Sequence, residues 1–261
     1  MDKTNGIQGA QVVRRLSEVL RTVSAAMPHG ISTSDVARST SLPRPTVHRL
    51  LASLAEEGFL DHDHSAGRWL LGPELYLMGS VAAERYDVTG VAREHVKALA
   101  EATGESAFFS VRRGDETVCL LREDGAFPIR SFVLFEGKRF PLGVASAGLA
   151  ILAFLREDAV ERYLSTADLS REFGPAHDSE ALRDRIAETR AAGYAVNPEL
   201  IVTGSWGMGA AVFDRAGQPA WALSLTGIGS RFTEQRRPEL GRLLLKHAHA
   251  LTTQLRSHGA P

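Results

Sequence analysis

The chain has 261 residues, of which 44% are hydrophobic and 23% charged, a composition typical of a globular protein with one large domain or two ordinary ones. No apolar run is long enough to cross a bilayer and the start lacks the pattern of a signal peptide, so we expect a cytoplasmic protein that does not enter a membrane. The formal net charge of −1 argues against a surface that attracts polyanions everywhere.

The N-terminal part predicts three helices. Apolar residues at helical spacing indicate the first over about residues 11–26. Ser32 stands three residues before Asp35, a capping pattern that begins a short second helix. The third helix lies within LPRPTVHRLLASLAEEGFL, residues 42–60, and Pro45 fits its first turn because no N–H is needed there. Its expected buried stripe and its terminating glycine are Val47, Leu50, Leu51, Leu54 and Gly58.

A short hairpin is predicted to follow the third helix. Apolar residues 59–60 and 69–71 flank a polar turn around residues 65–67. Three helices and a hairpin make a small module, which we assign to residues 1–72 because Gly72 and Pro73 mark its end. Residues 73–86 are a candidate linker helix, and residues 87–261 form the second predicted domain.

Beyond Val88, helical and strand patterns alternate, which predicts helices packed on a mostly antiparallel sheet. The fold class is therefore α+β, with an N-terminal helix-turn-helix module and a C-terminal α/β domain. The helices are expected over residues 91–104, 145–155, 179–193 and 233–256, and the strands over residues 106–113, 116–123, 129–137, 207–214 and 219–228.

Three helices followed by a hairpin are the arrangement of a winged helix-turn-helix, whose third helix enters the DNA major groove. The polar face of the third helix fits this role. Arg44 and Arg49 can fork to guanine or to phosphate. Thr46 can donate to phosphate or pack its methyl group on thymine, while His48 can hydrogen-bond but adds little charge. Ser53 is small enough to let the helix lie close to DNA.

The positive charge is concentrated around this face. Between Ala10 and Ser53 there are six arginines and no lysine against two acidic residues. Arg38 belongs to this basic region, and Arg68 on the hairpin is placed to reach the DNA backbone or minor groove. A lone arginine would be explained by solvation, but the combined pattern predicts DNA binding. The alternative is a winged helix that contacts protein, and the salt dependence of binding separates the two.

The chain resembles the IclR family of bacterial transcription regulators over nearly its whole length. This resemblance implies a winged-helix domain, a linker helix and a C-terminal effector-binding domain with a GAF-like fold. It also implies homodimers, often paired into dimers of dimers, that bind a pseudo-palindromic operator and respond to a small organic acid or aromatic metabolite. The stretches that carry it are VVRRLSEVLRTV, LPRPTVHRLLASLAEEGFL, GRWLLGPELYLMG, PLGVASAGLAILAFL, AETRAAGYAVNPEL and GMGAAVFDRAGQPAWALSLTG.

The resemblance places an effector pocket between the sheet and the loop before the apolar helix. In this sequence that loop contains Ser146 and Ala147. The resemblance also places Asn197 and Gly207 at the pocket, where the family often has an acidic residue and a cysteine. These differences indicate a pocket of altered shape with less negative charge.

Ser224 and Thr226 complete the expected effector site. The resemblance places a serine-like pair at these positions, and their spacing supports it independently, because residues two apart on a strand share a face. Two hydroxyl groups that point into one concavity are suited to a carboxylate or a hydroxyl group of a ligand.

Sequence patterns typical of enzymes are incomplete. Gly143–Gly148 is similar to a nucleophile elbow, but it lacks the G-x-S-x-G spacing and no partnered His-Asp set is evident. Gly207–Val212 begins like a dinucleotide-binding loop and lacks the third glycine. We therefore expect no catalytic residues and no cofactor.

Metal and thiol chemistry are also not expected. Two histidine pairs could chelate a metal but have no third ligand at a suitable spacing. The single cysteine, Cys119, lies in an apolar strand and is most simply a core residue, with a redox-sensing role as the alternative. The histidine pairs are His62 with His64 and His247 with His249.

Overall fold

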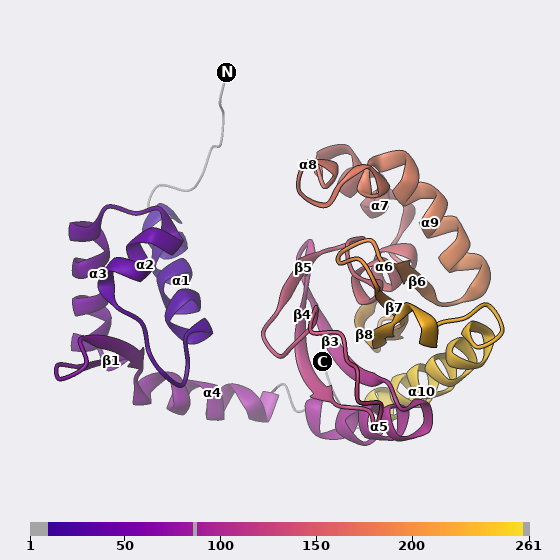
Figure 1. Ribbon diagram of the computed structural model, residues 1–261, viewed down its shortest axis with the longest axis horizontal. Coiled ribbons are helices and arrows are strands. Elements are labelled where there is room, and N and C mark those ends of the chain that lie inside the picture. The colour runs from indigo at the N-terminus through magenta and orange to yellow at the C-terminus, as the bar shows by residue number, and fades with distance from the viewer. Residues whose placement is uncertain (1–9, 86–87, 258–261) are drawn as a thin grey trace. The chain divides into compact units, whose positions relative to one another are not determined.

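A computed structural model describes residues 10–85 and 88–257 of the chain (Figure 1). The chain divides into two units, Met1–Glu84 and Arg85–Pro261. The division falls near the end of the predicted linker helix. Among the described residues, none of the helices combines the length and apolarity needed to span a membrane.

The first unit contains the predicted three helices, the hairpin and the linker helix. Ser32 caps the second helix as predicted, because its hydroxyl oxygen accepts the backbone N–H of Asp35 at 3.2 Å. The elements are α1 (Ala10–Ala25), α2 (Thr33–Thr40), α3 (Arg44–Glu56), β1 (Leu60–Asp63), β2 (Arg68–Leu71) and α4 (Pro73–Arg85).

The core of the first unit lies where the three helices meet the hairpin. Val23, Val47 and Leu51 are completely buried there. Trp69 of β2 belongs to the same core, and its indole N–H donates to Thr33 Oγ1 at 2.9 Å. A backbone bridge between Trp69 and Ile31 adds a third short segment to the hairpin. These contacts fix the direction in which α3 presents its outer face.

The second unit is built on a six-stranded antiparallel sheet in the order β5-β4-β3-β8-β7-β6. Neighbouring residues of each strand point to opposite faces, and consecutive residues of β7 and β8 are buried, so both faces of the sheet are covered. The strands are β3 (Ser106–Arg113), β4 (Glu116–Glu123), β5 (Arg139–Pro141), β6 (Ala195–Pro198), β7 (Ser205–Phe213) and β8 (Pro219–Ile228).

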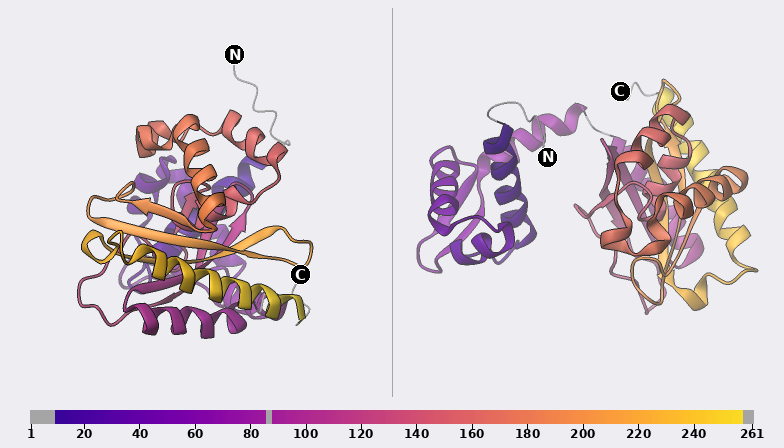
Figure 2. Two further views of the ribbon diagram at one scale, coloured as in Figure 1. Left: turned by 90° about the vertical axis from the view of Figure 1, so that its right-hand side faces the viewer. Right: turned by 90° about the horizontal axis from the view of Figure 1, so that it is seen from above.

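Helices cover both faces of this sheet (Figure 2). On one face α5 (Val88–Thr103) and α10 (Arg237–Ser257) pack together over β3 and β7. On the other face α6 (Ser146–Ala153) lies against β7 and β8, with α9 (Ser179–Ala192) beside it. The connections add α7 (Glu157–Thr166), α8 (Ser170–Phe173), η1 (Pro175–His177) and η2 (Gly229–Arg231).

The predicted strand over residues 129–137 is wrong, because these residues form an irregular loop between β4 and β5. The alternation of a strand is absent: Ser131 and Leu134, three residues apart, are buried, whereas Phe132 is 72% exposed. The chain rejoins the sheet only where Gly137 donates to Cys119 O at 2.8 Å. This difference matters because the loop forms one wall of the site described below.

Other differences concern short elements and boundaries. Helices α7 and α8, the short helix η1 and strand β6 were not predicted. The last helix begins at Arg237, four residues later than expected. By contrast, the predicted strands 106–113, 116–123 and 219–228 are confirmed with the same boundaries, and Gly193 ends α9 in the expected left-handed conformation, with φ 81°.

Candidate functional site

The outer face of α3 carries the polar residues expected from the sequence. Pro43 and Pro45 set the start of this helix, and Val47, Leu51 and Leu54 bury its inner side. Arg44, His48, Arg49 and Ser53 are exposed, whereas Thr46 is half-buried at the edge of the face. The exposed arc bears no carboxylate before Glu56, so its first turns present only neutral and basic groups.

Arg38 and Arg68 are already engaged with nearby groups of the first unit. Arg38 forms an ion pair with Asp35 at 2.9 Å. The Arg38 side chain is 78% exposed, so this pair contributes little to stability and Arg38 is able to bind another group instead. Arg68 donates to Gly30 O at 3.0 Å. The hydrogen bond from Ser32 holds the pKa of Asp35 below its usual value, with smaller contributions from these arginines.

The hairpin turn between β1 and β2 is fixed by Asp63. Its carboxylate accepts hydrogen bonds from the Ser65 hydroxyl at 2.6 Å and from the backbone N–H groups of Ser65 and Ala66. The ring of His62 stacks on Trp69 at 4.1 Å between centroids. The wing is therefore an ordered turn, and Arg68 is the basic residue that begins its second strand.

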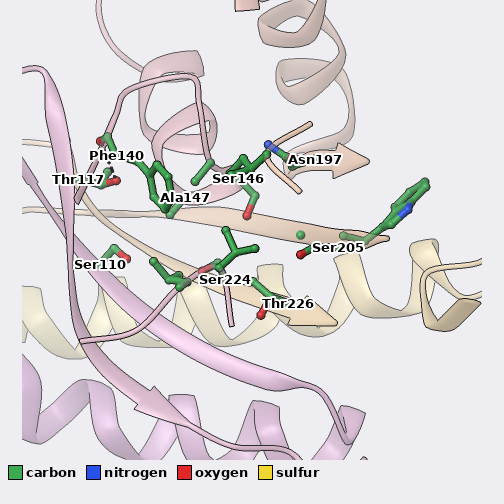
Figure 3. Close-up of a pocket in the computed structure, with 15 residues that line it drawn as sticks. Ser110, Thr117, Phe140, Ser146, Ala147, Asn197, Ser205, Ser224 and Thr226 are labelled. Carbon is green, nitrogen blue, oxygen red and sulfur yellow. Dashed lines mark hydrogen bonds between the residues drawn. The ribbon is translucent and has the colours of Figure 1, made fainter. Parts of the chain in front are cut away.

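A small pocket with a volume of about 30 Å³ lies between the sheet and α6 and opens to solvent at its mouth (Figure 3). It includes all six residues that the resemblance assigned to the effector site: Ser146, Ala147, Asn197, Gly207, Ser224 and Thr226. None of the described residues that line this cavity has an ionisable side chain. Ala145, in the loop before the apolar helix, and Trp206 also line it, as the resemblance indicated. The sequence did not identify the remaining lining residues, which are Ser110, Thr117, Val133, Leu134, Phe140, Ile201 and Ser205.

The floor of the cavity is the face of β7 and β8 that α6 covers. In the strand register Thr226 lies opposite Gly207, and Ser224 opposite Gly209. The hydroxyl groups of Ser224 and Thr226 are buried, and neither has a hydrogen-bond partner among the described residues. Buried hydroxyl groups are normally paired, so these two are available to a bound molecule.

The first turn of α6 lies directly above this floor. Gly209 allows the approach, because a Cβ atom there would lie 2.8 Å from Ser146 O. The N-cap residue Ala145 makes no side-chain capping hydrogen bond. The first N–H groups of a helix have no acceptor within the helix and carry partial positive charge, so this end of α6 favours a negatively charged oxygen.

Asn197 has a different position from the one expected of a direct ligand contact. It is 4% exposed, its Nδ2 donates to Val144 O at 2.6 Å, and its Oδ1 accepts the Leu200 N–H at 3.3 Å. Both polar ends of the amide are thus used on the backbone. Asn197 holds the loop before α6 against the loop after β6, a task that an aspartate could not perform because a carboxylate does not donate.

Two loops meet at the mouth of the cavity. The hydroxyl groups of Ser131 and Ser205 lie 2.6 Å apart and join the loop before β5 to the start of β7. Glu199, in the left-handed region with φ 58°, accepts the indole N–H of Trp206 at 3.1 Å. Hydrogen bonds from the Gly204 N–H and from Trp206 hold the pKa of the Glu199 carboxyl below its usual value. These contacts order the rim of the cavity.

The groups considered for other chemistry have ordinary surroundings. Burial raises the pKa of the Cys119 thiol to about 12, so it is protonated at neutral pH and suits the core role. The Nδ1 atoms of His62 and His64 lie 3.1 Å apart, whereas His247 contacts His95 at 3.1 Å and not His249. In residues 10–85 and 88–257, no group of three or more His, Cys, Asp or Glu side chains is arranged to hold a metal ion.

Comparison with known proteins matches two family models. Residues 80–253 match the C-terminal domain of bacterial transcriptional regulator IclR, and residues 12–64 match the IclR helix-turn-helix domain. The transcriptional regulator KipR of Bacillus subtilis is 30% identical over 211 residues, 80% of this chain and 84% of its own. The transcriptional repressor AllR of Salmonella typhimurium is 30% identical over 250 residues, 95% of this chain and 91% of its own.

A solved structure shares the fold. It is an IclR homolog from Microbacterium hydrocarbonoxydans in complex with 4-hydroxybenzoate, which superposes with a TM-score of 0.76 at 24% identity and covers 94% of this chain and 99% of the other. The winged helix-turn-helix and the α/β domain predicted from the sequence are thus confirmed as the architecture.

Proposed function

Because the chain belongs to the IclR family of bacterial transcriptional regulators, we propose that it binds a pseudo-palindromic DNA operator as a homodimer. A small organic acid or aromatic metabolite in the cavity under α6 changes its affinity for that operator. The ligand binds more tightly when the two winged helices have one relative placement than when they have the other. The change that it causes in the free energy of DNA binding equals this difference in ligand-binding free energy.

The outer face of α3 supports the DNA-binding part of this function. Arg44, His48 and Arg49 are exposed there without a carboxylate nearby, while the core beneath holds the helix in one orientation. Arg38 and Arg68 flank the face, and their present partners are a surface carboxylate and a backbone carbonyl. A phosphate group can replace such partners because it forms stronger, charge-assisted hydrogen bonds with arginine.

The cavity supports the ligand-binding part. Ser224 and Thr226 offer two buried hydroxyl groups without partners among the described residues, and the α6 N-terminus, whose first N–H groups have no acceptor within the helix, lies at the same pocket. This combination stabilises a carboxylate without any basic side chain. The solved relative bound to 4-hydroxybenzoate is a regulator of the same fold that holds an aromatic acid, which is the ligand class proposed for this chain.

Replacing Arg49 with alanine should weaken DNA binding about tenfold to a hundredfold, the usual effect of losing one arginine contact. If Arg49 binds phosphate, affinity falls for all sequences and the slope of log affinity against log salt decreases by about one. If it reads guanine, discrimination at one base pair is lost. Fluorescence anisotropy with labelled operator variants at several salt concentrations measures both effects.

The control for this experiment is Arg242→Ala, which removes an exposed arginine of α10, outside the helix-turn-helix module. It should leave DNA affinity unchanged. Wild-type binding that hardly changes between low and moderate salt would contradict the DNA-binding function and favour the alternative, a winged helix that contacts protein.

An apolar stripe on α4 supports the homodimer. Tyr76 and Val81 are 76% and 73% exposed, and Leu77 and Met78 are about half exposed beside them. Large apolar side chains clustered on one exposed helix mark an interaction surface, and a two-fold symmetric dimer would pair this helix with its own copy. Fixing the two winged helices in this way would set the separation of the DNA half-sites.

The double substitution Leu77→Asp with Val81→Asp should therefore weaken the dimer by about a hundredfold or more, since each charge occurs twice in a symmetric interface. Light scattering after size-exclusion chromatography would then show a single chain at micromolar concentration. The control Ser165→Asp adds a charge to an exposed position of α7, outside the stripe, and should leave the dimer intact. A dimer that survives the double substitution would place the interface elsewhere.

A further inference from the structure

A second group of hydroxyl side chains lines the cavity away from the first turn of α6. Ser110 of β3 is 1% exposed, and Thr117 of β4 is 4% exposed (Figure 3). The Ser110 hydroxyl takes part in none of the side-chain hydrogen bonds found within residues 10–85 and 88–257. Thr117 donates to Phe140 O at 3.4 Å, which leaves the lone pairs of its oxygen free to accept.

The strand register gives the distance between Ser224, at one end of the cavity, and Ser110, at the other. Ser224 lies opposite Phe108, and Ser110 is the next residue of β3 on that face, opposite Ala222. Diagonal neighbours of this kind on adjacent strands are about 7–8 Å apart. A single six-membered ring with substituents at its two ends, or a chain of four or five carbons, spans this gap.

The region between the two polar ends is apolar. Val133 and Leu134 of the loop before β5 line the cavity together with Phe140 of β5. The lining contains no basic residue, so one carboxylate can be stabilised at the α6 N-terminus and a second at Ser110 would be buried without a counter-charge. A dicarboxylate therefore does not fit this cavity, whereas a neutral hydrogen-bonding group at the far end does.

We propose that the cavity recognises a monocarboxylate with a hydroxyl group at its far end, and that Ser110 and Thr117 select for this hydroxyl. This inference rests on the proposed effector site, because the carboxylate must bind at Ser224, Thr226 and α6. The ligand hydroxyl donates to the Thr117 oxygen, whose own O–H is used on Phe140 O, and accepts from the Ser110 O–H. Without that hydroxyl, Ser110 stays buried and unpaired.

The test is isothermal titration calorimetry with two pairs of probes. The first pair is 4-hydroxybenzoate and 4-methylbenzoate, and the second is 5-hydroxypentanoate and hexanoate. Within at least one pair, the hydroxylated member should bind the full-length protein about tenfold to a hundredfold more tightly, since loss of the hydroxyl leaves a buried polar group unsatisfied. Terephthalate, a dicarboxylate of similar length, should bind more weakly than 4-hydroxybenzoate.

Substitutions assign the preference to its residues. Ser110→Ala and, independently, Thr117→Val should reduce the preference for the hydroxylated member to less than threefold while the other member binds as before. The double variant Ser224→Ala with Thr226→Ala should weaken every probe. Ser165→Ala, on the exposed side of α7, is the matched control and should change neither property.

The outcomes separate the two proposals. Two results would contradict the role of Ser110 and Thr117 but not the proposed effector site. One is equal binding of hydroxylated and unhydroxylated probes, and the other is a preference that survives both Ser110→Ala and Thr117→Val. Failure of all four monocarboxylates to bind, or binding that is unaffected by the Ser224 and Thr226 substitutions, overturns both.

Discussion

Replacing Glu105 with glutamine should lower the free energy of unfolding of the second unit by about 3 kcal/mol, the low end of the range for breaking a buried ion pair. Glu105 is 2% exposed, and its Oε1 accepts from Arg231 Nε at 2.8 Å and from Arg236 Nη1 at 2.6 Å. Both guanidinium groups are less than one-third exposed. Glutamine would leave the two positive charges facing each other without a counter-ion.

Glu105 also anchors the loop that forms one wall of the cavity. Arg231 lies over the ring of Phe127 at 4.4 Å, and Phe127 donates its backbone N–H to Gly104 O at 3.1 Å. Phe127 belongs to the base of the loop that carries Ser131 to the cavity mouth. Loss of the ion pair therefore affects the loop as well as the stability of the unit.

Thermal unfolding followed by circular dichroism measures this change. For a unit of this size, about 3 kcal/mol corresponds to a fall in Tm of roughly 6–12 °C. The control is Glu123→Gln, which removes the half-buried partner of the exposed Arg93 and should cost less than about 0.5 kcal/mol. If both substitutions lowered Tm equally, the buried ion pairs of Glu105 would contribute no more to the stability of the unit than an ordinary surface pair.

Local signals made the first unit predictable from its sequence. The cap at Ser32, the prolines before and within the first turn of α3, and the glycine after it each act within a few residues. Long strands such as β3 and β8 were predictable for a similar reason, because their apolar runs are bounded by turn residues on both sides.

Contacts between distant segments could not be predicted in the same way. The apolar residues of the loop before β5 indicated a strand, but the edge of β4 is paired by the three residues of β5 instead. Ser110 lies in an apolar strand, and nothing local shows that its face lines a cavity. The same holds for Asn197, whose position followed from the resemblance but whose bond to Val144 O depends on the packing of two loops.

The substitution Gly209→Ala should disrupt the cavity because the atoms in its way belong to the backbone. A Cβ atom at position 209 would lie 2.8 Å from Ser146 O, 2.9 Å from Ser146 C and 3.1 Å from Ala147 N. Backbone atoms cannot rotate aside as a side chain can, so the first turn of α6 must move away from the sheet. We expect a loss of about 1–3 kcal/mol in the free energy of unfolding of the second unit.

The movement should also weaken ligand binding by at least about tenfold, because binding of a carboxylate requires the α6 N–H groups and the hydroxyl groups of Ser224 and Thr226 at the same place. Binding of 4-hydroxybenzoate measures this loss. Operator binding without ligand should be retained, since Gly209 belongs to the second unit. Retention of DNA affinity would show that the first unit is intact, and a cooperative thermal unfolding transition followed by circular dichroism would show that the second unit is folded and that the defect lies in the cavity.

Gly207→Ala is the matched control, on the same strand and the same face. A Cβ atom there would meet Ser146 Oγ at 3.1 Å, and this hydroxyl belongs to a side chain that can rotate. The control should therefore cost less than about 1 kcal/mol. If the two alanine variants had equal stability and equal affinity for 4-hydroxybenzoate, the site would not depend on the close contact between α6 and Gly209. A defect specific to Gly209→Ala would instead show that the site depends on the absence of a side chain beneath the helix.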